Sequence, residues 1–447
     1  MMATKPRVLI VGGGFAGLAA AKALANAAVS VTVFDRRNHH VFQPLLYQVA
    51  TAALSPADIS APIRSVLRNQ SNCEVVLAEV VGVDLAQRRV LLRTGYVEYD
   101  YLVLAAGSTH AYFGHDEWSA IAPGLKSIED ATELRRRILL AYEHAEYEGG
   151  EAARRAALTF GIVGGGATGV ELAGAIKEIA GKTLAADYRH IDTRTTRVII
   201  FEAGERLLTP FTKRLSARAQ RDLERMGVEV RLNSTVTNVV PGGLYLGDEF
   251  IPIRNVFWAA GVKASPVSET LGVARDRAGR VIVAPDLSIR EYPEVFVAGD
   301  LAAAKSADTG LLVPGVAQGG IQMGHYAGKT IAQEVGACAA ASARRPFSYH
   351  DKGTMAVIGK AKAVAHIGRF EFGGFLAWVL WGGIHISFLI GFRNRIQVLL
   401  SWFWNWLLNS RDARLITGDA QLEIDVPRST AFLPRKQEPP STPAILE

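Results

Sequence analysis

The chain has 447 residues, which is enough for two or three domains with cores of their own. Its net charge of +6 is too small to indicate a nucleic-acid-binding protein, although it fits a mild attraction to an anionic membrane surface. Cys73 and Cys338 are the only cysteines and lie far apart, which excludes a disulfide scaffold, a zinc site and a redox-active disulfide. We predict no metal site. The mean hydropathy of +0.15 is high for a wholly soluble enzyme.

The first predicted element is a short aliphatic strand, Arg7–Val11, which runs directly into a glycine-rich turn. A strand this early leaves no room for a cleavable signal peptide. The turn has the spacing G-x-G-x-x-G, formed by Gly12, Gly14 and Gly17. A helix, Leu18–Ala27, and a strand, Val29–Phe34, are predicted to follow and to end at Asp35.

This order is typical of a dinucleotide-binding unit. The first glycine allows the tight turn, the second lets the backbone approach the pyrophosphate, and the third lets helix and strand pack closely. The pyrophosphate is expected at the N-terminus of the helix, on its free N–H groups. Asp35 is expected to accept hydrogen bonds from ribose hydroxyls. The alternative is that Asp35 only caps a turn.

The same signature occurs a second time. A strand beginning at Thr159 leads into Gly164, Gly166 and Gly169. We predict a helix over Val170–Ile179, an insertion over Lys182–Arg194 that extends the helix into a loop, and a strand Arg197–Phe201 that ends at Glu202. An acid at this position repels a 2′-phosphate, so this site should prefer NADH, although the nearby Arg206 leaves that preference open. As with Asp35, Glu202 could instead cap a turn.

Shorter signals connect the two units. Buried strands ending in Ala-Ala-Gly close both units, at Tyr101–Gly107 and at Asn255–Gly261, and a charged helical connector is predicted over 127–155. Val295–Asp300 reads as a strand that returns to the first unit, with Asp300 either binding a cofactor or capping the next segment. A helix is predicted over Gly315–Lys329.

The C-terminal region is strongly apolar. Phe372–Phe392 has no formally charged residue and is long enough to span a bilayer, and Ile396–Leu408 holds three tryptophans. Five glycines and His385 are unusual in a lone lipid-facing helix, so we favour helices lying in the membrane interface, with Arg393 and Arg395 toward phosphates. A spanning helix and a buried dimer contact are the alternatives. Residues 427–447 are rich in proline, serine and charge and are expected to be disordered.

These signals predict an α/β protein with two Rossmann-like dinucleotide-binding domains and a C-terminal, membrane-associating helical region. The predicted boundaries are 1–112 with 285–335 for a discontinuous first domain and 113–284 for the second. Residues 336–410 form the membrane-anchoring and dimerisation region, and 411–447 form a tail that is largely disordered at its end.

The chain resembles type II NADH dehydrogenases, the single-subunit NADH:quinone oxidoreductases, over roughly residues 5–410. The resemblance rests on motifs in matching order: VGGGFAGL at 11–18, FQPLLYQVAT at 42–51, VGGGATGVELAGAI at 163–176, VFVAGD at 295–300, AQGGIQMG at 317–324 and YHDKGTMAVIGKAKAV at 349–364. It implies one noncovalent FAD per chain, NADH as donor and a membrane quinone, ubiquinone or menaquinone, as acceptor, without proton pumping. It also implies a homodimer held peripherally on the cytoplasmic face of the cell membrane by residues of about 372–408.

The resemblance assigns most of the predicted ligand contacts. FAD is expected at Gly12, Gly14, Phe15, Ala16, Gly17, Asp35, Arg36, Gln43, Leu46, Ala106, Gly107, Gly299, Asp300, Ala317 and Gln318. NADH is expected at Gly164, Gly165, Gly166, Thr168, Gly169, Glu171, Glu202, Ala260 and Gly261. The segment Gln43–Tyr47 would line the flavin ring, or else belong to an ordinary core.

Four residues are predicted to serve catalysis: Glu171, Gln318, Gln322 and Lys352. In the family pattern Glu171 faces the nicotinamide and the flavin; the alternative is a partner for the helix dipole. Gln318 and Gln322 lie one helical turn apart and can face one quinone pocket, to which Lys352 is expected to point. The alternatives are helix capping or interdomain hydrogen bonds for the glutamines and a plain surface position for the lysine. Glycine stands where the family often has the inner alanine of A-Q-x-A-x-Q, which predicts a roomier site wall.

Three other readings remain at this stage. Sulfide:quinone reductases share the layout but need reactive cysteines, and ferredoxin reductases do not call for the tryptophan-rich C-terminal region. A non-catalytic redox sensor that binds FAD and NAD(H) would use the same glycine turns.

Overall fold

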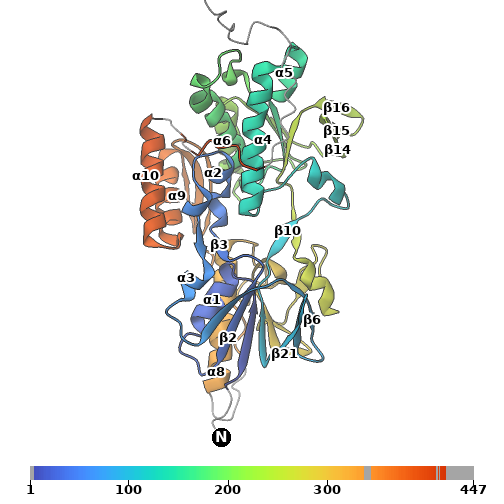
Figure 1. Cartoon of the computed structure of the whole chain (residues 1–447), viewed down its shortest axis with the longest axis vertical. Coiled ribbons are helices and arrows are strands. Elements are labelled where there is room, and N and C mark those ends of the chain that lie inside the picture. The colour runs from blue at the N-terminus through green and yellow to red at the C-terminus, as the bar shows by residue number, and fades with distance from the viewer. Residues whose placement is uncertain (1–4, 337–343, 409–410, 412, 419–447) are drawn as a thin grey trace, which may run out of the picture.

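The computed structural model describes residues 5–336, 344–408, 411 and 413–418. Two α/β units lie end to end along the long axis of the molecule, and the C-terminal sheet and helices lie beside the second unit (Figure 1). The predicted fold class is confirmed. The predicted disordered segment 427–447 lies outside the described residues.

The first unit is built on a six-stranded sheet with the strand order β20-β21-β9-β1-β2-β5. All neighbours are parallel except β20 and β21. Its strands are β1 (Arg7–Val11), β2 (Ser30–Asp35), β5 (Cys73–Leu77), β9 (Tyr101–Leu104), β20 (Ser288–Ile289) and β21 (Tyr292–Val297). The return of the chain predicted at Val295 is therefore confirmed, because β21 pairs with β9 although the two strands are nearly 200 residues apart in sequence.

Helices α1 (Phe15–Ala23) and α8 (Ala317–Gly336) pack against each other on this sheet. Their backbones approach closely because a side chain at Gly324 or Gly328 would collide with the carbonyl groups of Ala16 or Ala20. Gly320, by contrast, has ordinary room for a methyl group beside Ala16. The close packing of α1 and α8 therefore does not require a glycine at position 320. Its missing side chain leaves extra space in the site wall, as the sequence predicts.

The second unit has a parallel sheet with the order β13-β12-β11-β17. Its strands are β11 (Thr159–Val163), β12 (Arg197–Phe201), β13 (Val228–Arg231) and β17 (Asn255–Trp258). Its main helices are α4 (Ile128–Tyr147), α5 (Glu151–Ala157), α6 (Ala167–Glu178) and α7 (Lys213–Arg225). The predicted connector 127–155 is thus two helices, and the predicted extension of α6 is a π-helical turn, Ile179–Thr183, followed by a loop.

We call each glycine turn, with its strand and the helix that follows it, a cradle. The two cradle helices begin three residues earlier than predicted, at Phe15 and Ala167. The second glycine of each turn, Gly14 or Gly166, is the extended N-cap residue, so the third glycine lies inside the first helical turn. The helix α8 in turn runs one to two turns beyond its predicted end at Lys329.

Small antiparallel sheets and short elements complete the two units. They are β3 (His39–Val41) with β4 (Ser60–Pro62), β6 (Val80–Asp84) with β7 (Arg89–Leu92) and β8 (Gly95–Glu98), β14 (Asn238–Val240) with β15 (Gly243–Leu246) and β16 (Glu249–Pro252), β19 (Val281–Ile282) with β22 (Ala302–Ala303), and the helices α2 (Leu46–Ala50) and α3 (Ile63–Leu67). The two crossings between the units pair as β10 (Ser108–His110) and β18 (Val262–Ala264). After this crossing Val267, Leu271 and Val281 pack in the first core, although the sequence places residues up to 284 in the second domain.

The C-terminal region forms a three-stranded antiparallel sheet followed by two helices. The strands are β23 (Thr354–Gly359), β24 (Lys362–Ile367) and β25 (Phe370–Gly373), and the helices are α9 (Phe375–Phe388) and α10 (Phe392–Leu408). The sheet lies against α6, whose Gly174 touches the carbonyl of Ile358 so closely that a side chain would collide with it. No helix within the described residues is both long and apolar enough to cross a bilayer.

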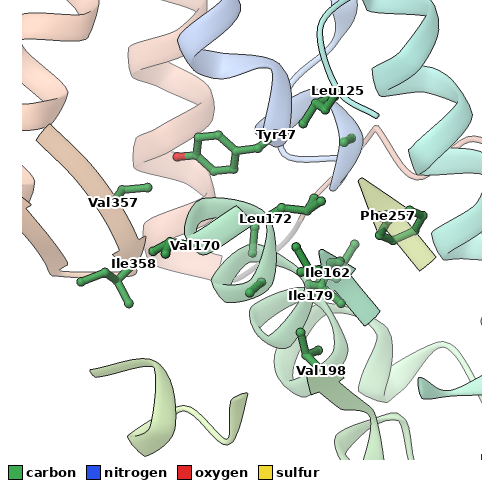
Figure 2. Close-up of a cluster of buried hydrophobic side chains, with 14 of the residues drawn as sticks. Tyr47, Leu125, Ile162, Val170, Leu172, Ile179, Val198, Phe257, Val357 and Ile358 are labelled. Carbon is green, nitrogen blue, oxygen red and sulfur yellow. The ribbon is translucent and has the colours of Figure 1, made fainter. Parts of the chain in front are cut away.

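One hydrophobic core joins parts of the chain that are distant in sequence. Helix α2 from the first unit, helices α4 and α6 from the second, and the C-terminal strands and helices all contribute to it. Figure 2 shows Tyr47 of α2 lying above α6, near Val170 and Leu172 and directed toward Val357 of β23. This core therefore fixes the C-terminal region against both units.

Candidate active site

The first glycine turn opens into a cavity of about 760 Å³ at the carboxyl ends of β1, β9 and β21. Gly12 has φ +103°, and a side chain there would collide with the carbonyl group of Ala105. A side chain at Gly17 would collide with the carbonyl of Gly12, whereas the space beside Gly14 is open. The first and third glycines thus form the turn itself, and the second leaves space beside the backbone for a ligand.

The carboxylate of Asp35 holds this turn in place. It accepts hydrogen bonds from the backbone N–H groups of Gly13, at 2.6 Å, and Arg37, at 2.7 Å. Asp35 also lines the cavity, so its structural role and a bond to ribose are compatible.

Twelve of the fifteen residues predicted to contact FAD line this cavity: Gly12, Gly14, Phe15, Ala16, Asp35, Arg36, Gln43, Ala106, Gly107, Gly299, Asp300 and Ala317. The other three lie elsewhere. Gly17 is inside α1, Leu46 is in the core shared with the second unit, and Gln318 is half-buried on α8.

Ser108 and Lys126, two of the cavity residues that were not predicted, contact Asp300. The Asp300 carboxylate accepts a hydrogen bond from the hydroxyl of Ser108, at 2.6 Å, and lies 3.4 Å from the ammonium of Lys126. Lys126 also donates to Ser108. These residues come from three separate segments, so no local sequence motif links them.

The second turn repeats the design of the first. The carboxylate of Glu202 accepts hydrogen bonds from the N–H groups of Gly165, at 2.6 Å, and Gly204, at 2.7 Å. Gly164 has φ +109°, and a side chain there would be within 2.7 Å of backbone atoms of Ala259 and Ala260. The cradle is therefore preformed, with Gly166 and Thr168 exposed at the start of α6.

Arg206 is engaged within its own loop. Its guanidinium donates to the carbonyl groups of Phe211, at 2.6 Å, and Thr209, at 2.8 Å, and to the hydroxyl of Ser216. On the other side of the turn, Gly261 lies against the exposed ring of Phe113, a residue that the sequence did not indicate.

Glu171, the fifth residue of α6, lines a separate cavity of about 130 Å³ between α6, α2, β23 and the C-terminal helices. We call it the Glu171 cavity. Burial raises the pKa of the Glu171 carboxyl to about 8, although the N–H of Val357 donates to it at 3.3 Å and opposes the rise. Burial and the neighbouring Glu171 also raise the pKa of the Tyr47 phenol. Near neutral pH both groups therefore carry protons.

A chain of hydrogen bonds runs along this cavity. The indole N–H of Trp402 donates to the side-chain oxygen of Gln48, at 2.7 Å, and the amide of Gln48 donates to the phenol oxygen of Tyr47, at 2.9 Å. Trp378, Trp381 and Trp406 supply apolar wall. The cavity thus combines proton-bearing groups with flat aromatic surfaces.

The floor of the Glu171 cavity holds a buried ion pair. The guanidinium of Arg411 lies 3.2 Å from the carboxylate of Glu178 and donates to the carbonyl groups of Thr51 and Ala175. Arg411 belongs to the predicted C-terminal tail, where the sequence carries no sign of a buried charge.

The other three predicted catalytic residues do not line the Glu171 cavity. Both polar atoms of the Gln322 side chain bond the backbone of His350, at 2.9 Å each, which is the interdomain alternative. Lys352 is exposed, with its ammonium 5.7 Å from the ring centre of Phe388, which agrees with the alternative of a surface position. Gln318 lies on α8 one turn before Gln322.

Known proteins match this chain along most of its length. A family model described as pyridine nucleotide-disulphide oxidoreductase matches residues 6–329, and one described as NDH2 C-terminal domain matches residues 351–412. The chain is 46% identical over 424 residues to a type II NADH:quinone oxidoreductase, Ndh, of Mycobacterium tuberculosis, covering 92% of this chain and 90% of that one. It is 44% identical to a second such protein, NdhA, of the same organism, with 92% and 89% coverage.

The chain belongs to the type II NADH:quinone oxidoreductase family. A solved structure of NDH2 from Plasmodium falciparum in complex with NADH superposes with a TM-score of 0.83 at 18% identity, covering 93% of this chain and all of that one. A sulfide:quinone oxidoreductase from Aquifex aeolicus superposes with a TM-score of 0.69 at 16% identity, covering 90% and 95% of the two chains. At such identities these structures establish only the shared fold.

The C-terminal helices of this type II family member expose many large apolar side chains. Together they form what we call the apolar face: Phe375, Leu376, Val379, Phe388, Phe392, Ile396, Leu399, Leu400, Phe403, Trp404, Leu407 and Leu408. Arg395, expected to point toward lipid phosphates, instead donates to the carbonyl groups of Ser387 and Leu389 at the end of α9.

Proposed function

We propose that this chain is a respiratory NADH:quinone oxidoreductase that does not pump protons. The observation that carries the proposal is the position of α6. The N-terminus of this helix is the second glycine turn, and Glu171, the fifth residue of the helix, lines a second, aromatic cavity. One helix thus links a site for a nicotinamide donor to a site for an acceptor.

The first-turn cavity fits a noncovalent FAD. It has the open space beside Gly14, the positive helix end of α1 and the Asp35 carboxylate that a nucleotide requires. Asp300 and Gly107 line the same cavity and are proposed to hold the ribitol chain. When bound, FAD supplies a centre that accepts a hydride from NADH and passes two electrons to quinone. The residues of the chain then position the reactants, keep water out of the site and supply protons.

We propose that the first unit, 1–112 with 285–335, holds FAD and that 113–284 holds NADH. The packing of Val267, Leu271 and Val281 in the first core supports a boundary between the two proposed domains that lies nearer β18 than residue 284.

NADH is the proposed donor rather than NADPH. The Glu202 carboxylate at the end of β12 would face the adenosine ribose and repel a 2′-phosphate. Arg206, the one nearby cation that the sequence left open, has its donors bound to its own loop. These two observations together favour NADH.

Glu171 is proposed to hold the proton that quinone reduction consumes. A carboxylic acid with a pKa of about 8 is protonated at neutral pH and can donate to a developing quinol oxygen. Tyr47 and Gln48 would orient the acceptor through the hydrogen-bond chain to Trp402. Gln318 remains a proposed contact of the flavin and quinone. We propose Lys352 only as an exposed cation beside Phe388, and Gln322 as the residue that holds His350, two residues before Lys352, in place.

The apolar face is proposed to rest on the cytoplasmic side of the cell membrane, where NADH is available and quinone is dissolved in the lipid. Exposed aromatic and aliphatic side chains on two adjacent helices are typical of an interfacial anchor. A homodimer is also proposed, to be checked by light scattering of the detergent-solubilised protein.

The proposal is tested with the purified protein. We expect a yellow protein whose flavin is released by acid as free FAD and which oxidises NADH, and NADPH at least tenfold less efficiently, with a soluble ubiquinone or menaquinone analogue. Flavin that is reduced by NADH but never reoxidised by either quinone would instead indicate a redox sensor or another acceptor.

A further inference from the structure

An arginine-lined pocket lies next to the apolar face, on the second unit. Arg214, Arg218 and Arg221 of α7 line it together with Leu215 and Gly373, and its volume is about 300 Å³. This is at the lower end of small-molecule sites, about 300–1,000 Å³. We call it the arginine pocket. It contributes to neither glycine turn and does not include Glu171.

The C-terminal sheet makes room for these arginines. A side chain at Gly373 or Gly374 would lie 2.6 Å or less from the guanidinium end of Arg218. Gly374 is the N-cap residue of α9, and the next two residues, Phe375 and Leu376, are exposed members of the apolar face. The positive pocket and the apolar surface are therefore continuous.

The side chains around the arginine pocket carry an excess of positive charge. Arg214 pairs with Glu371 at 2.8 Å, while Asp222 lies beneath Arg218 and Arg225, at 3.7 Å and 3.5 Å. Arg221 forms no ion pair or hydrogen bond with any described residue. Four guanidinium groups thus face two carboxylates, a net charge of +2, and Lys213 and Glu224 on the same helix add one charge of each sign.

We propose that the arginine pocket binds the phosphate of an anionic membrane phospholipid. The inference rests on the proposed membrane association of the apolar face and names the lipid that it selects. Paired arginines bind phosphate oxygens with strong, charge-assisted hydrogen bonds, and the adjoining Phe375 and Leu376 provide the apolar surface that acyl chains require. A water-soluble phosphate has no acyl chains and would make no contact with this apolar surface.

The test is binding of the FAD-loaded full chain to vesicles. Wild-type protein is expected to bind vesicles with phosphatidylglycerol more tightly than pure phosphatidylcholine vesicles, by about 25-fold if two arginines each contribute about fivefold near an anionic surface. The R218Q/R221Q variant is expected to lose that preference and to bind phosphatidylcholine vesicles as the wild type does. Inorganic phosphate, at ionic strength matched with chloride, should not compete.

Two further variants separate this site from general charge. R277Q/R290Q removes the same charge from exposed arginines of the first unit, one before β19 and one between β20 and β21, and should keep the preference. R221Q changes an exposed side chain that has no partner among the described residues, so the variant should bind the anionic vesicles about fivefold more weakly without any change in melting temperature. Soluble-quinone turnover should stay unchanged in all variants.

The inference is overturned if R218Q/R221Q keeps the preference, if R277Q/R290Q loses it equally, or if competing phosphate removes it. Wild-type protein that binds both vesicle types equally also overturns it, yet leaves the membrane association intact. Wild-type protein that binds neither vesicle contradicts both.

Discussion

Replacement of Glu171 by glutamine removes the one carboxyl group of the Glu171 cavity whose pKa is strongly raised. Glutamine keeps the size and the hydrogen-bonding oxygen for the Val357 N–H but carries no exchangeable acid proton. We expect the rate of flavin reduction by NADH to stay within about threefold of wild type. The rate of reoxidation by quinone should fall by about 10²-fold or more, which is the usual contribution of a positioned acid.

The pH dependence follows from the direction of the shift. Burial raises the pKa from 4.5 to about 8, so the acid form needed for donation disappears as the pH rises through 8. Wild-type quinone reduction should therefore decline above pH 8, while flavin reduction does not, and the Glu171→Gln variant should lack this decline.

The stability of the wild-type protein should also fall as the pH rises. The folded protein retains a proton that the unfolded chain loses above pH 4.5, so wild-type stability falls between pH 4.5 and 8. The full shift corresponds to about 5 kcal/mol at about 1.4 kcal/mol per pH unit, and we expect roughly half of this because the side chain retains some solvent access. Glu171→Gln should accordingly melt higher than wild type at pH 9 and equally at pH 4.

Stopped-flow spectroscopy of the two half-reactions, from pH 6 to 9.5, checks these expectations. Glu178→Gln is the matched control, because it alters another acid of the same helix and cavity and should keep the decline above pH 8. A Glu171→Gln variant that slows both half-reactions equally, or that keeps the alkaline decline, would refute the role of Glu171 as proton donor.

The remaining predictions concern the cradles and the apolar face. Gly12→Ala should lower the melting temperature and abolish FAD retention, because the new methyl group meets a backbone carbonyl at a left-handed φ and costs about 2–4 kcal/mol. Gly14→Ala should leave the melting temperature of the flavin-free protein unchanged, because the space beside Gly14 is open, but it should weaken FAD binding at least tenfold. Glu202→Ala should reduce kcat/KM for NADH at least tenfold and should lower the ratio of kcat/KM for NADH to that for NADPH. An unchanged ratio would show that this acid only holds the glycine turn in place. Leu400→Asp with Phe403→Asp, at positions 58% and 57% exposed, should release the protein from vesicles without lowering its melting temperature, and continued sedimentation with vesicles would argue against the apolar face as the anchor.

The sequence predicts the two cradles well because each is local. A strand, three glycines and an acid within about 40 residues supply the turn and its hydrogen bonds, so the motif can be recognised without knowing which distant strand packs against it. What the sequence missed in the cradles is also local: the third glycine lies within the helix, so α1 and α6 begin at Phe15 and Ala167.

The acceptor side of the site could be predicted only in part. Glu171 follows from its motif, but the cavity around it depends on Trp402 meeting Gln48 across 354 residues, and on Arg411 from the expected tail lying beneath it. Lys352 was singled out by its motif, but the motif does not indicate whether the side chain is buried, and the structure leaves it exposed. Such long-range packing follows from how α9 and α10 fold over α6, which leaves no periodic pattern in the sequence.

The central claim is that electrons pass from NADH through the flavin to a quinone. Sequential-mixing stopped flow tests it directly: the protein is first bleached with one equivalent of NADH without oxygen and then mixed with a quinone analogue. The account predicts that the flavin absorbance returns at least as fast as steady-state turnover, with one quinol formed per NADH. A flavin that stays reduced until air is admitted would contradict it.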